Sequence, residues 1–121
     1  MPPRYIVVAT DLFVSEDLCE ILRTVENSVL AVAVSNLSGA CNLLSDGAPV
    51  DIVFLNGSAA QTQDVQFLAL VQARGAFLVR IGGPMPLADT CPHSEVSIPA
   101  PFTNEVITAL LEARRVPAAR V

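Results

Sequence analysis

The sequence contains no lysine and no tryptophan, and it has no long apolar run. All seven basic residues are arginines, and twelve acidic residues give a formal net charge of −5. Proteins that bind nucleic acid neutralise phosphates with clustered basic residues, and here only Arg114 and Arg115 are adjacent. A membrane span needs about 20 consecutive apolar residues, and no segment supplies them. We therefore expect neither a nucleic acid nor a membrane as the partner.

Cysteine is also scarce, with three residues at irregular spacing, which is typical of reduced thiols in a cytoplasmic protein. The first apolar stretch is interrupted by Thr10 and Asp11, so it is too short for a signal peptide. A length of 121 residues suits one domain, and 52% hydrophobic against 16% charged residues excludes disorder. We predict one cytoplasmic domain over residues 1–115, followed by a tail or linker over residues 116–121.

Five short runs rich in valine and isoleucine recur along the chain and predict five β-strands. They are Tyr5–Ala9, Val29–Val34, Val50–Leu55, Ala76–Ile81 and Val96–Ile98. The first four do not alternate apolar with polar residues, which is typical of parallel strands covered by helices on both faces.

Segments of helical periodicity separate these runs. Leu18, Ile21, Leu22 and Val25 follow one helical stripe, and Ser15 is the expected N-cap of this first helix. The expected limits of the other helices are Asn36 and Asp46–Gly47 for the second, Val65–Val71 ending at Gly75 for the third, and Thr103 or Asn104 at the start of the last.

Alternating strands and helices with short links predict an α/β fold with helices on both faces of a parallel sheet. Right-handed crossovers favour the flavodoxin-like (αβ)5 three-layer sandwich with strand order 2-1-3-4-5. Between the fourth and fifth predicted strands, Gly82–Pro86 and Pro92 leave little room for a helix. The fourth helix is therefore expected to be short, distorted or absent.

In this fold, ligands bind at the carboxyl ends of the strands, where the strand order reverses. Two segments near these ends, Val50–Asn56 and Pro99–Phe102, resemble the third strand and the Lys-Pro-Phe end of the fifth strand in response-regulator receiver domains. The resemblance covers residues 4–115. Receiver domains are the phospho-acceptor domains of two-component signalling. It implies a cis peptide bond before Pro101.

The same resemblance indicates which groups the phosphorylation chemistry would need. Receivers use a carboxylate ending the third strand, an acidic pair that holds Mg²⁺, a Thr or Ser ending the fourth strand, and a Lys on the fifth. The corresponding positions here are Asn56, Ala9 with Thr10, Ile81, and Ala100. An amide cannot form an acylphosphate, and Asp11 alone is a poor Mg²⁺ site. The resemblance thus implies a pseudo-receiver without metal, cofactor or enzymatic activity.

Several polar residues allow a second interpretation. Asp11 either caps nearby amides or coordinates a cation, and the first is favoured. Arg80 is either an edge-facing charge, paired or solvated, or a contact to an anionic ligand beside Gly82 and Gly83. Cys91 and His93 are too few for a zinc site, and Cys41 lies on an apolar helical stripe.

The proline-rich segment also alters the face through which receivers contact other proteins. Met85, Leu87 and Val96 are candidate exposed contacts, although packing against the sheet is an equal alternative. The first hypothesis is an interaction module in bacterial two-component signalling that contacts a histidine kinase, another receiver or output domain, or a second copy. The alternative is a sensor that binds an anionic molecule such as a cyclic dinucleotide through Arg80. An enzyme is not favoured, because no G-x-G-x-x-G motif or P-loop is present.

Overall fold

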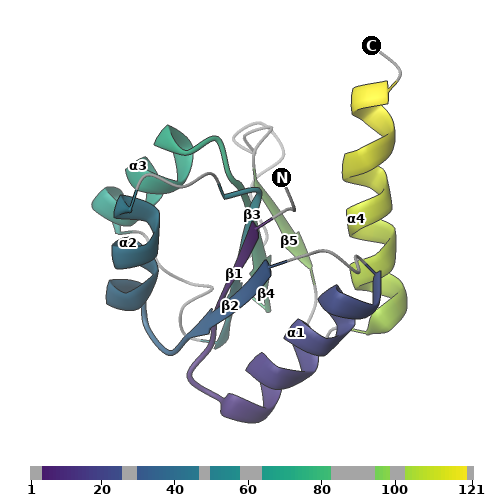
Figure 1. Ribbon diagram of the computed structural model, residues 1–121, viewed down its shortest axis with the longest axis horizontal. Helices are drawn as coiled ribbons and strands as arrows, with labels where there is room; N and C mark the ends of the chain where they lie inside the picture. The colour runs from purple at the N-terminus through teal and green to yellow at the C-terminus, as the bar shows by residue number, and fades with distance from the viewer. Residues whose placement is uncertain are drawn as a thin grey trace.

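The computed structural model describes residues 4–25, 30–46, 50–57, 64–82, 95–98 and 103–119, which contain five strands and four helices (Figure 1). The strands are β1 (Arg4–Val8), β2 (Leu30–Val34), β3 (Ile52–Asn56), β4 (Phe77–Ile81) and β5 (Glu95–Ile98). The helices are α1 (Leu12–Val25), α2 (Leu37–Ser45), α3 (Val65–Ala73) and α4 (Asn104–Ala119). Every predicted strand is present, within two residues of its expected bounds.

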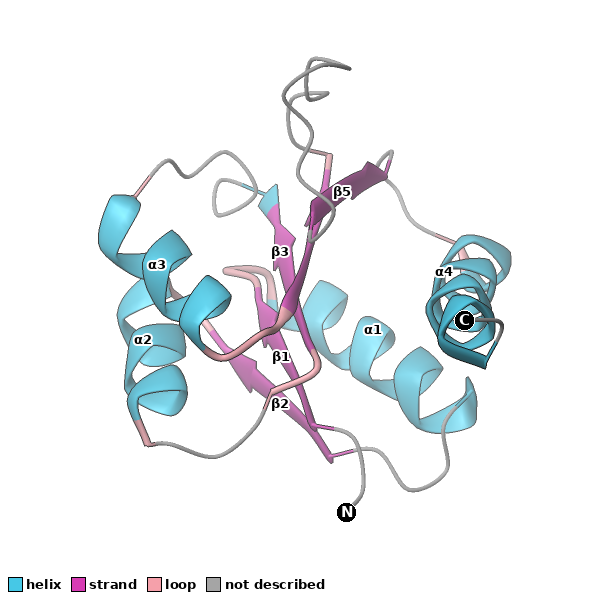
Figure 2. Cartoon of the chain, turned by 90° about the horizontal axis from the view of Figure 1, so that it is seen from above, coloured by secondary structure: helices cyan, strands magenta, loops and turns pink. Residues whose placement is uncertain are grey.

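The five strands form one parallel sheet in the order β2-β1-β3-β4-β5, which confirms the flavodoxin-like prediction. Helices α1 and α4 cover one face of the sheet, and α2 and α3 cover the other (Figure 2). The three layers follow from right-handed crossovers, which place successive helices on opposite faces once the strand order reverses.

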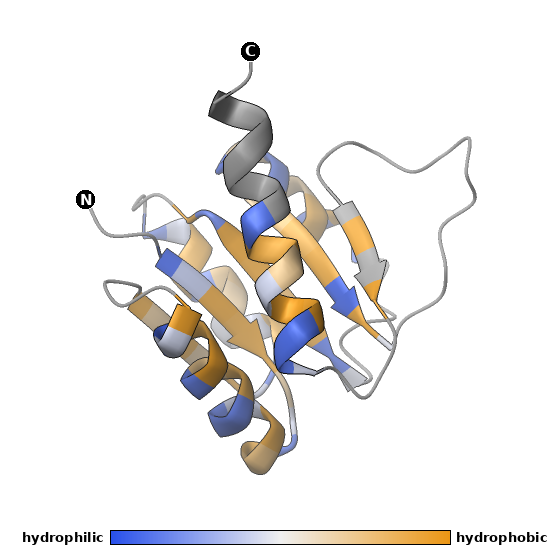
Figure 3. Cartoon of the chain, turned by 90° about the vertical axis from the view of Figure 1, so that its right-hand side faces the viewer, coloured by the Kyte–Doolittle hydropathy of each residue, from blue (hydrophilic) through white to orange (hydrophobic). Residues whose placement is uncertain are grey.

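Side chains of the central strands alternate between two hydrophobic clusters, one under each helical layer. In β1, Tyr5 and Val7 join the cluster under α1 and α4, whereas Ile6 and Val8 join the cluster under α2 and α3. The strands are accordingly mostly hydrophobic in Figure 3, while the helices carry both colours. Burial on both faces is confirmed for β1, β3 and β4.

Strand β2 is different, because it lies at the edge of the sheet and pairs with β1 alone. None of its five residues is fully buried, and Leu30 is 54% exposed. Ala31 packs against the cluster under α1 and α4, and Val34 packs against the cluster under α2 and α3, so the prediction of cover on both faces holds for this strand only in part. Its apolar run, Leu30–Val34, resembles those of the central strands, and only the strand order reveals its edge position.

Helix α1 begins earlier than predicted. Asp11, rather than Ser15, is the N-cap: Asp11 Oδ1 accepts hydrogen bonds from the backbone N–H groups of Phe13 and Val14, at 2.9 and 3.4 Å. Ser15 lies buried inside the helix. The apolar stripe that faces the core starts at Leu18, so periodicity alone could not locate the first turn of the helix.

The other predicted helix limits that fall on described residues are confirmed, including Asp46 as the C-cap of α2, whereas Gly47 lies outside the described ranges. Asn36 accepts from the Gly39 N–H at 2.8 Å at the start of α2, and the Thr103 hydroxyl accepts from the Val106 N–H at 3.2 Å at the start of α4. Gly75 follows α3 with φ +69°, a conformation that favours glycine.

Some predictions concern residues outside the described ranges. One is the shape of the helix expected between the fourth and fifth strands, in the segment Gly83–Ser94, which includes the contact residues Met85 and Leu87. The others are Ala100 and Pro101. Helix α4 continues to Ala119, beyond the expected domain limit at residue 115, and the tail or linker remains a prediction. Among the helices whose residues are placed, none is long and apolar enough to cross a bilayer.

Candidate functional site at the carboxyl ends of the strands

The strand register brings three of the predicted site residues into one row. Val8 lies opposite Leu55, so Ala9 follows next to Asn56, and Asn56 lies opposite Ile81 on β4. Ala9 and Ile81 are buried, and Asn56 is half-buried at the end of β3. The sequence prediction that these positions meet at one edge of the sheet is consistent with this register.

This row contains one polar side chain, the amide of Asn56. The Ala9 side chain is a methyl group, and its backbone N–H donates to the Val34 carbonyl at 3.1 Å. Ile81 packs in the hydrophobic cluster under α1 and α4. The row therefore offers no carboxylate for phosphoryl transfer and no hydroxyl for a phosphoryl oxygen, and its flanking positions are apolar.

Two carboxylates at the same end of the sheet act as helix caps. Asp11 caps α1, and Asp64 Oδ1 accepts from the N–H groups of Gln66 and Phe67 at 3.0 and 3.1 Å at the start of α3. A negative charge at this position also interacts favourably with the helix dipole. The favoured interpretation of Asp11 as a capping residue is confirmed.

The described cysteines, Cys19 and Cys41, are free thiols. Burial raises the pKa of Cys19, and Arg23 offsets part of this shift. Burial, together with the charge of Asp64, raises the pKa of Cys41. Both thiols are therefore protonated near neutral pH and are poor nucleophiles. Within the ranges that the structure describes, no group of three His, Cys, Asp or Glu side chains could hold a metal ion.

Arg80 does not face an edge of the sheet. It lies on β4, between Leu55 of β3 and Ser97 of β5, and it is only 8% exposed. Because Val79 and Ile81 point toward α1 and α4, Arg80 points toward the opposite layer. The interpretation of Arg80 as a solvated edge charge is therefore wrong.

Gly82 adopts φ +78°, and its N–H donates to the Ile98 carbonyl at 2.9 Å, which links the ends of β4 and β5. This N–H is thus already used within the sheet and does not face an anion. The hypothetical anion site consisted of Arg80, Gly82 and Gly83. Gly82 is now excluded from it, and Gly83 lies outside the described residues.

The predicted contact residue Val96 is half-buried and packs against the cluster under α1 and α4. Of the two alternatives left open for this residue, the observed packing favours the one against the sheet.

Sequence reasoning missed three exposed apolar residues at this end of the molecule, Leu12, Phe13 and Val65, which we call the apolar rim. They are 70%, 83% and 76% exposed and lie in the first turns of α1 and α3. Leu12 and Val65 directly follow a capping aspartate, and Phe13 comes one residue later. An apolar residue directly after an N-cap was therefore the sequence signal that could have revealed them. Leu12 and Phe13 are adjacent on α1, whereas Val65 lies on α3 at the other face of the sheet, and exposed apolar side chains of this size are available for contact with a partner.

Solved structures of receiver domains share the fold of this chain. No protein-family model matches the chain, and no curated protein sequence matches it. A response regulator receiver protein from Sinorhizobium medicae superposes with a TM-score of 0.72 at 20% identity, over 95% of this chain and 96% of that one.

Two further solved structures share the same fold over nearly the whole chain. The N-terminal domain of a response regulator/sensory box/GGDEF protein from Carboxydothermus hydrogenoformans has a TM-score of 0.70 at 16% identity, over 96% of this chain and 97% of that one. The signal receiver domain of an HD domain-containing protein from Pseudomonas fluorescens has a TM-score of 0.67 at 15% identity, over 98% of this chain and 97% of that one. At these identities the likeness establishes the fold: the chain has the flavodoxin-like fold of receiver domains.

Proposed function

We propose that this chain is a pseudo-receiver, a domain of bacterial two-component signalling that acts through protein contact without being phosphorylated. The observation that carries the proposal is the row Ala9, Asn56 and Ile81, in which an amide lies between two buried apolar residues. No acyl phosphate forms on an amide, and Asp11 is engaged as a helix cap.

A contact function is supported by the apolar rim, whose three exposed side chains lie in helix turns that begin at the carboxyl ends of the strands. Burying such side chains against a partner is worth about 1.5–3 kcal/mol each. The proposed partners are a histidine kinase, another receiver or output domain, or a second copy of this chain, in the cytoplasm. Neither a nucleic acid, a membrane nor a catalytic activity forms part of the proposal.

The test is phosphorylation with a small donor. The purified chain is incubated with acetyl phosphate and Mg²⁺ and examined by intact-mass spectrometry, alongside Asn56→Asp as the matched variant. We expect no adduct of about 80 Da, the mass of one phosphoryl group, on the native chain. In the same samples, millimolar Mg²⁺ should leave the melting temperature unchanged. An acid-labile adduct on Asn56, or a melting temperature that rises by several degrees, would refute the proposal.

The ligand-sensing alternative has less support, because Arg80 is buried and the Gly82 N–H is bonded within the sheet. A thermal-shift screen with nucleotides and cyclic dinucleotides separates the two functions. Specific stabilisation that Arg80→Ala abolishes and Arg80→Lys retains in part would favour the sensor. The absence of any stabilising nucleotide favours the contact module.

A further inference from the structure

A groove of about 600 Å³ lies beside the free edge of β2. One wall is formed by the outer flank of α1, including Glu16, Glu20 and Arg23, and the other by Ala31 and Ala33 of β2. Helix α1 packs over β2 and runs in the opposite direction, so the Glu16 end of the groove lies near Val34 and the Arg23 end near Leu30 (Figure 1).

The backbone of β2 has hydrogen-bonding groups that point into this groove. The Ala9 N–H donates to the Val34 carbonyl, so the backbone groups of Val34 point toward β1. In a parallel ladder, the N–H and C=O of one residue point to the same side, and the side alternates along the strand. Ala31 and Ala33 therefore direct two N–H and two C=O groups away from the sheet.

The free edge of β2 lacks the features that normally prevent strand pairing. Natural edge strands carry charges, prolines or bulges that disfavour a further strand. The other edge strand, β5, contains Glu95 and Ser97. Strand β2 reads Leu-Ala-Val-Ala-Val, with regular pairing to β1 over all five residues and with Leu30 more than half exposed. No other described strand pairs with it.

We propose that the free edge of β2 pairs with β2 of a second copy of this chain, antiparallel, about a two-fold axis at Val32. Ala31 then lies opposite Ala33 of the second copy, and the outward backbone groups of both residues form four hydrogen bonds across the axis. Because the two chains are identical, one register satisfies all eight outward groups of the two strands.

The side chains fit the same register. On one face, Leu30 lies opposite Val34 of the second copy, which covers the exposed leucine. On the other face, the small side chains of Ala31 and Ala33 leave room for the two α1 helices to approach. The antiparallel axis brings the Arg23 end of one groove to the Glu16 and Glu20 end of the other, so opposite charges meet twice.

This pairing goes beyond the proposed function, because the free edge of β2 is distinct from the row at the strand ends. A chain that is phosphorylated but dimeric would refute only the pseudo-receiver, and a monomer that resists phosphorylation would refute only the pairing.

Sedimentation velocity of the full chain tests the pairing. An interface made of two five-residue strands and the flanks of two helices is small. We therefore expect a monomer–dimer equilibrium with a dissociation constant between about 10 μM and about 1 mM. A monomer throughout this range would overturn the proposal.

A pair of matched variants then locates the interface. Ala33→Lys adds a charge at an exposed edge position and should raise the dissociation constant at least about tenfold. Thr24→Lys adds the same charge at an exposed position of α1 that does not line the groove, and it should leave dimerisation unchanged. Equal dimerisation of the native chain and Ala33→Lys would place the interface elsewhere and refute the pairing.

A charge exchange keeps the test valid if Ala33→Lys fails to fold. Arg23→Glu alone should weaken the dimer, and adding Glu16→Arg and Glu20→Arg should restore it.

Amide hydrogen exchange gives an independent readout: protection of the Ala31 and Ala33 N–H groups should rise with concentration, whereas protection of Val32, which faces β1, should not. Absence of either pattern in a dimeric sample would contradict the proposed register.

Discussion

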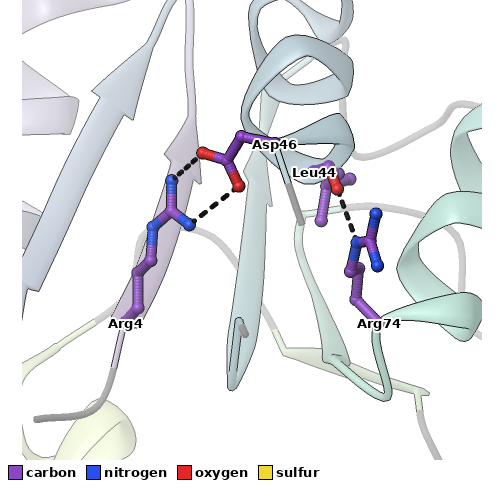
Figure 4. A network of polar contacts seen from close by, with 4 residues as sticks. All are labelled: Arg4, Leu44, Asp46 and Arg74. Atoms are coloured by element: carbon purple, nitrogen blue, oxygen red, sulfur yellow. Dashed lines mark hydrogen bonds and ion pairs between the residues drawn. The ribbon is translucent and has the colours of Figure 1, made fainter. Parts of the chain in front are cut away.

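The two ends of the sheet use charged residues differently. At the amino ends of the strands, Arg4 forms a bidentate ion pair with Asp46, with a shorter N–O distance of 3.0 Å, and Arg74 Nε donates to the Leu44 carbonyl at 2.6 Å (Figure 4). The backbone N–H of Arg4 also donates to Asp51 at 3.1 Å. These bonds join residues 30 or more positions apart.

At the carboxyl ends, the carboxylates of Asp11 and Asp64 accept hydrogen bonds from N–H groups two or three residues ahead. Between them the strands end in Ala9, Asn56 and Ile81. The hydrogen bonds of these charged groups therefore join distant elements at the amino ends, whereas at the carboxyl ends the two aspartates cap helices. In this fold the carboxyl ends are where ligands bind, so the absence of a carboxylate from the row Ala9, Asn56 and Ile81 is consistent with the proposed pseudo-receiver.

The largest expected effect comes from returning acids to the carboxyl end. Thr10→Asp combined with Asn56→Asp places two carboxylates near Asp11. Like-charge repulsion should lower the free energy of unfolding by about 3 kcal/mol without metal. Mg²⁺ at ten times its dissociation constant should restore about 1.4 kcal/mol.

Urea denaturation with and without Mg²⁺ measures both effects, and Thr10→Asp alone is the control that should not respond to the metal. If Mg²⁺ leaves the free energy of unfolding of the double variant unchanged, this end of the sheet does not form a Mg²⁺ site even with two added carboxylates.

A smaller effect is expected at the amino end. Arg74→Met keeps the length of the side chain and removes its hydrogen bond to the Leu44 carbonyl. We expect a loss of about 2 kcal/mol in urea denaturation, as for other charge-assisted bonds to a part-buried acceptor. Gln72→Met, at an exposed position of the same helix, should be close to neutral. Similar results for both variants would show that the long-range bond contributes nothing.

The smallest effect concerns the helix cap at the carboxyl end. Asp11→Ala should destabilise the chain by about 1 kcal/mol, whereas Asp11→Asn should be nearly neutral, because asparagine caps as well as aspartate. Thermal denaturation distinguishes them. If Asn were as costly as Ala, the charge of Asp11 would matter beyond capping, and the contrast between the two ends would weaken.

Much of this architecture was predictable because it depends on local periodicity. The apolar runs identified all five strands, and Asn36, Gly75 and Thr103 marked helix limits by their own capping chemistry. The start of α1 was not predictable from the stripe, because Leu12 and Phe13 are exposed and lie outside the periodic pattern that burial imposes. Asp11 was the available signal, since an aspartate before an apolar segment is a common N-cap.

Some features of the candidate site were likewise predictable from the sequence, and others required the tertiary structure. The identities of Asn56 and Ile81 exclude an acyl phosphate and a hydroxyl contact without any coordinates. The role of Arg80 required the strand order, since a charge in an apolar run can lie at an edge or beneath a helix. Whether the Gly82 N–H is free depended on its bond to Ile98, which comes from a different strand.

The order of strands and helices along the chain, and the identities of the side chains that follow the strands, were determined by the sequence alone, because side-chain identity and apolar spacing are properties of neighbouring residues. The exposure of β2, the burial of Arg80 and the projection of the apolar rim were decided by the tertiary structure. Each of these depends on which strands pair and which helices cover them, and such contacts join residues that are distant along the chain.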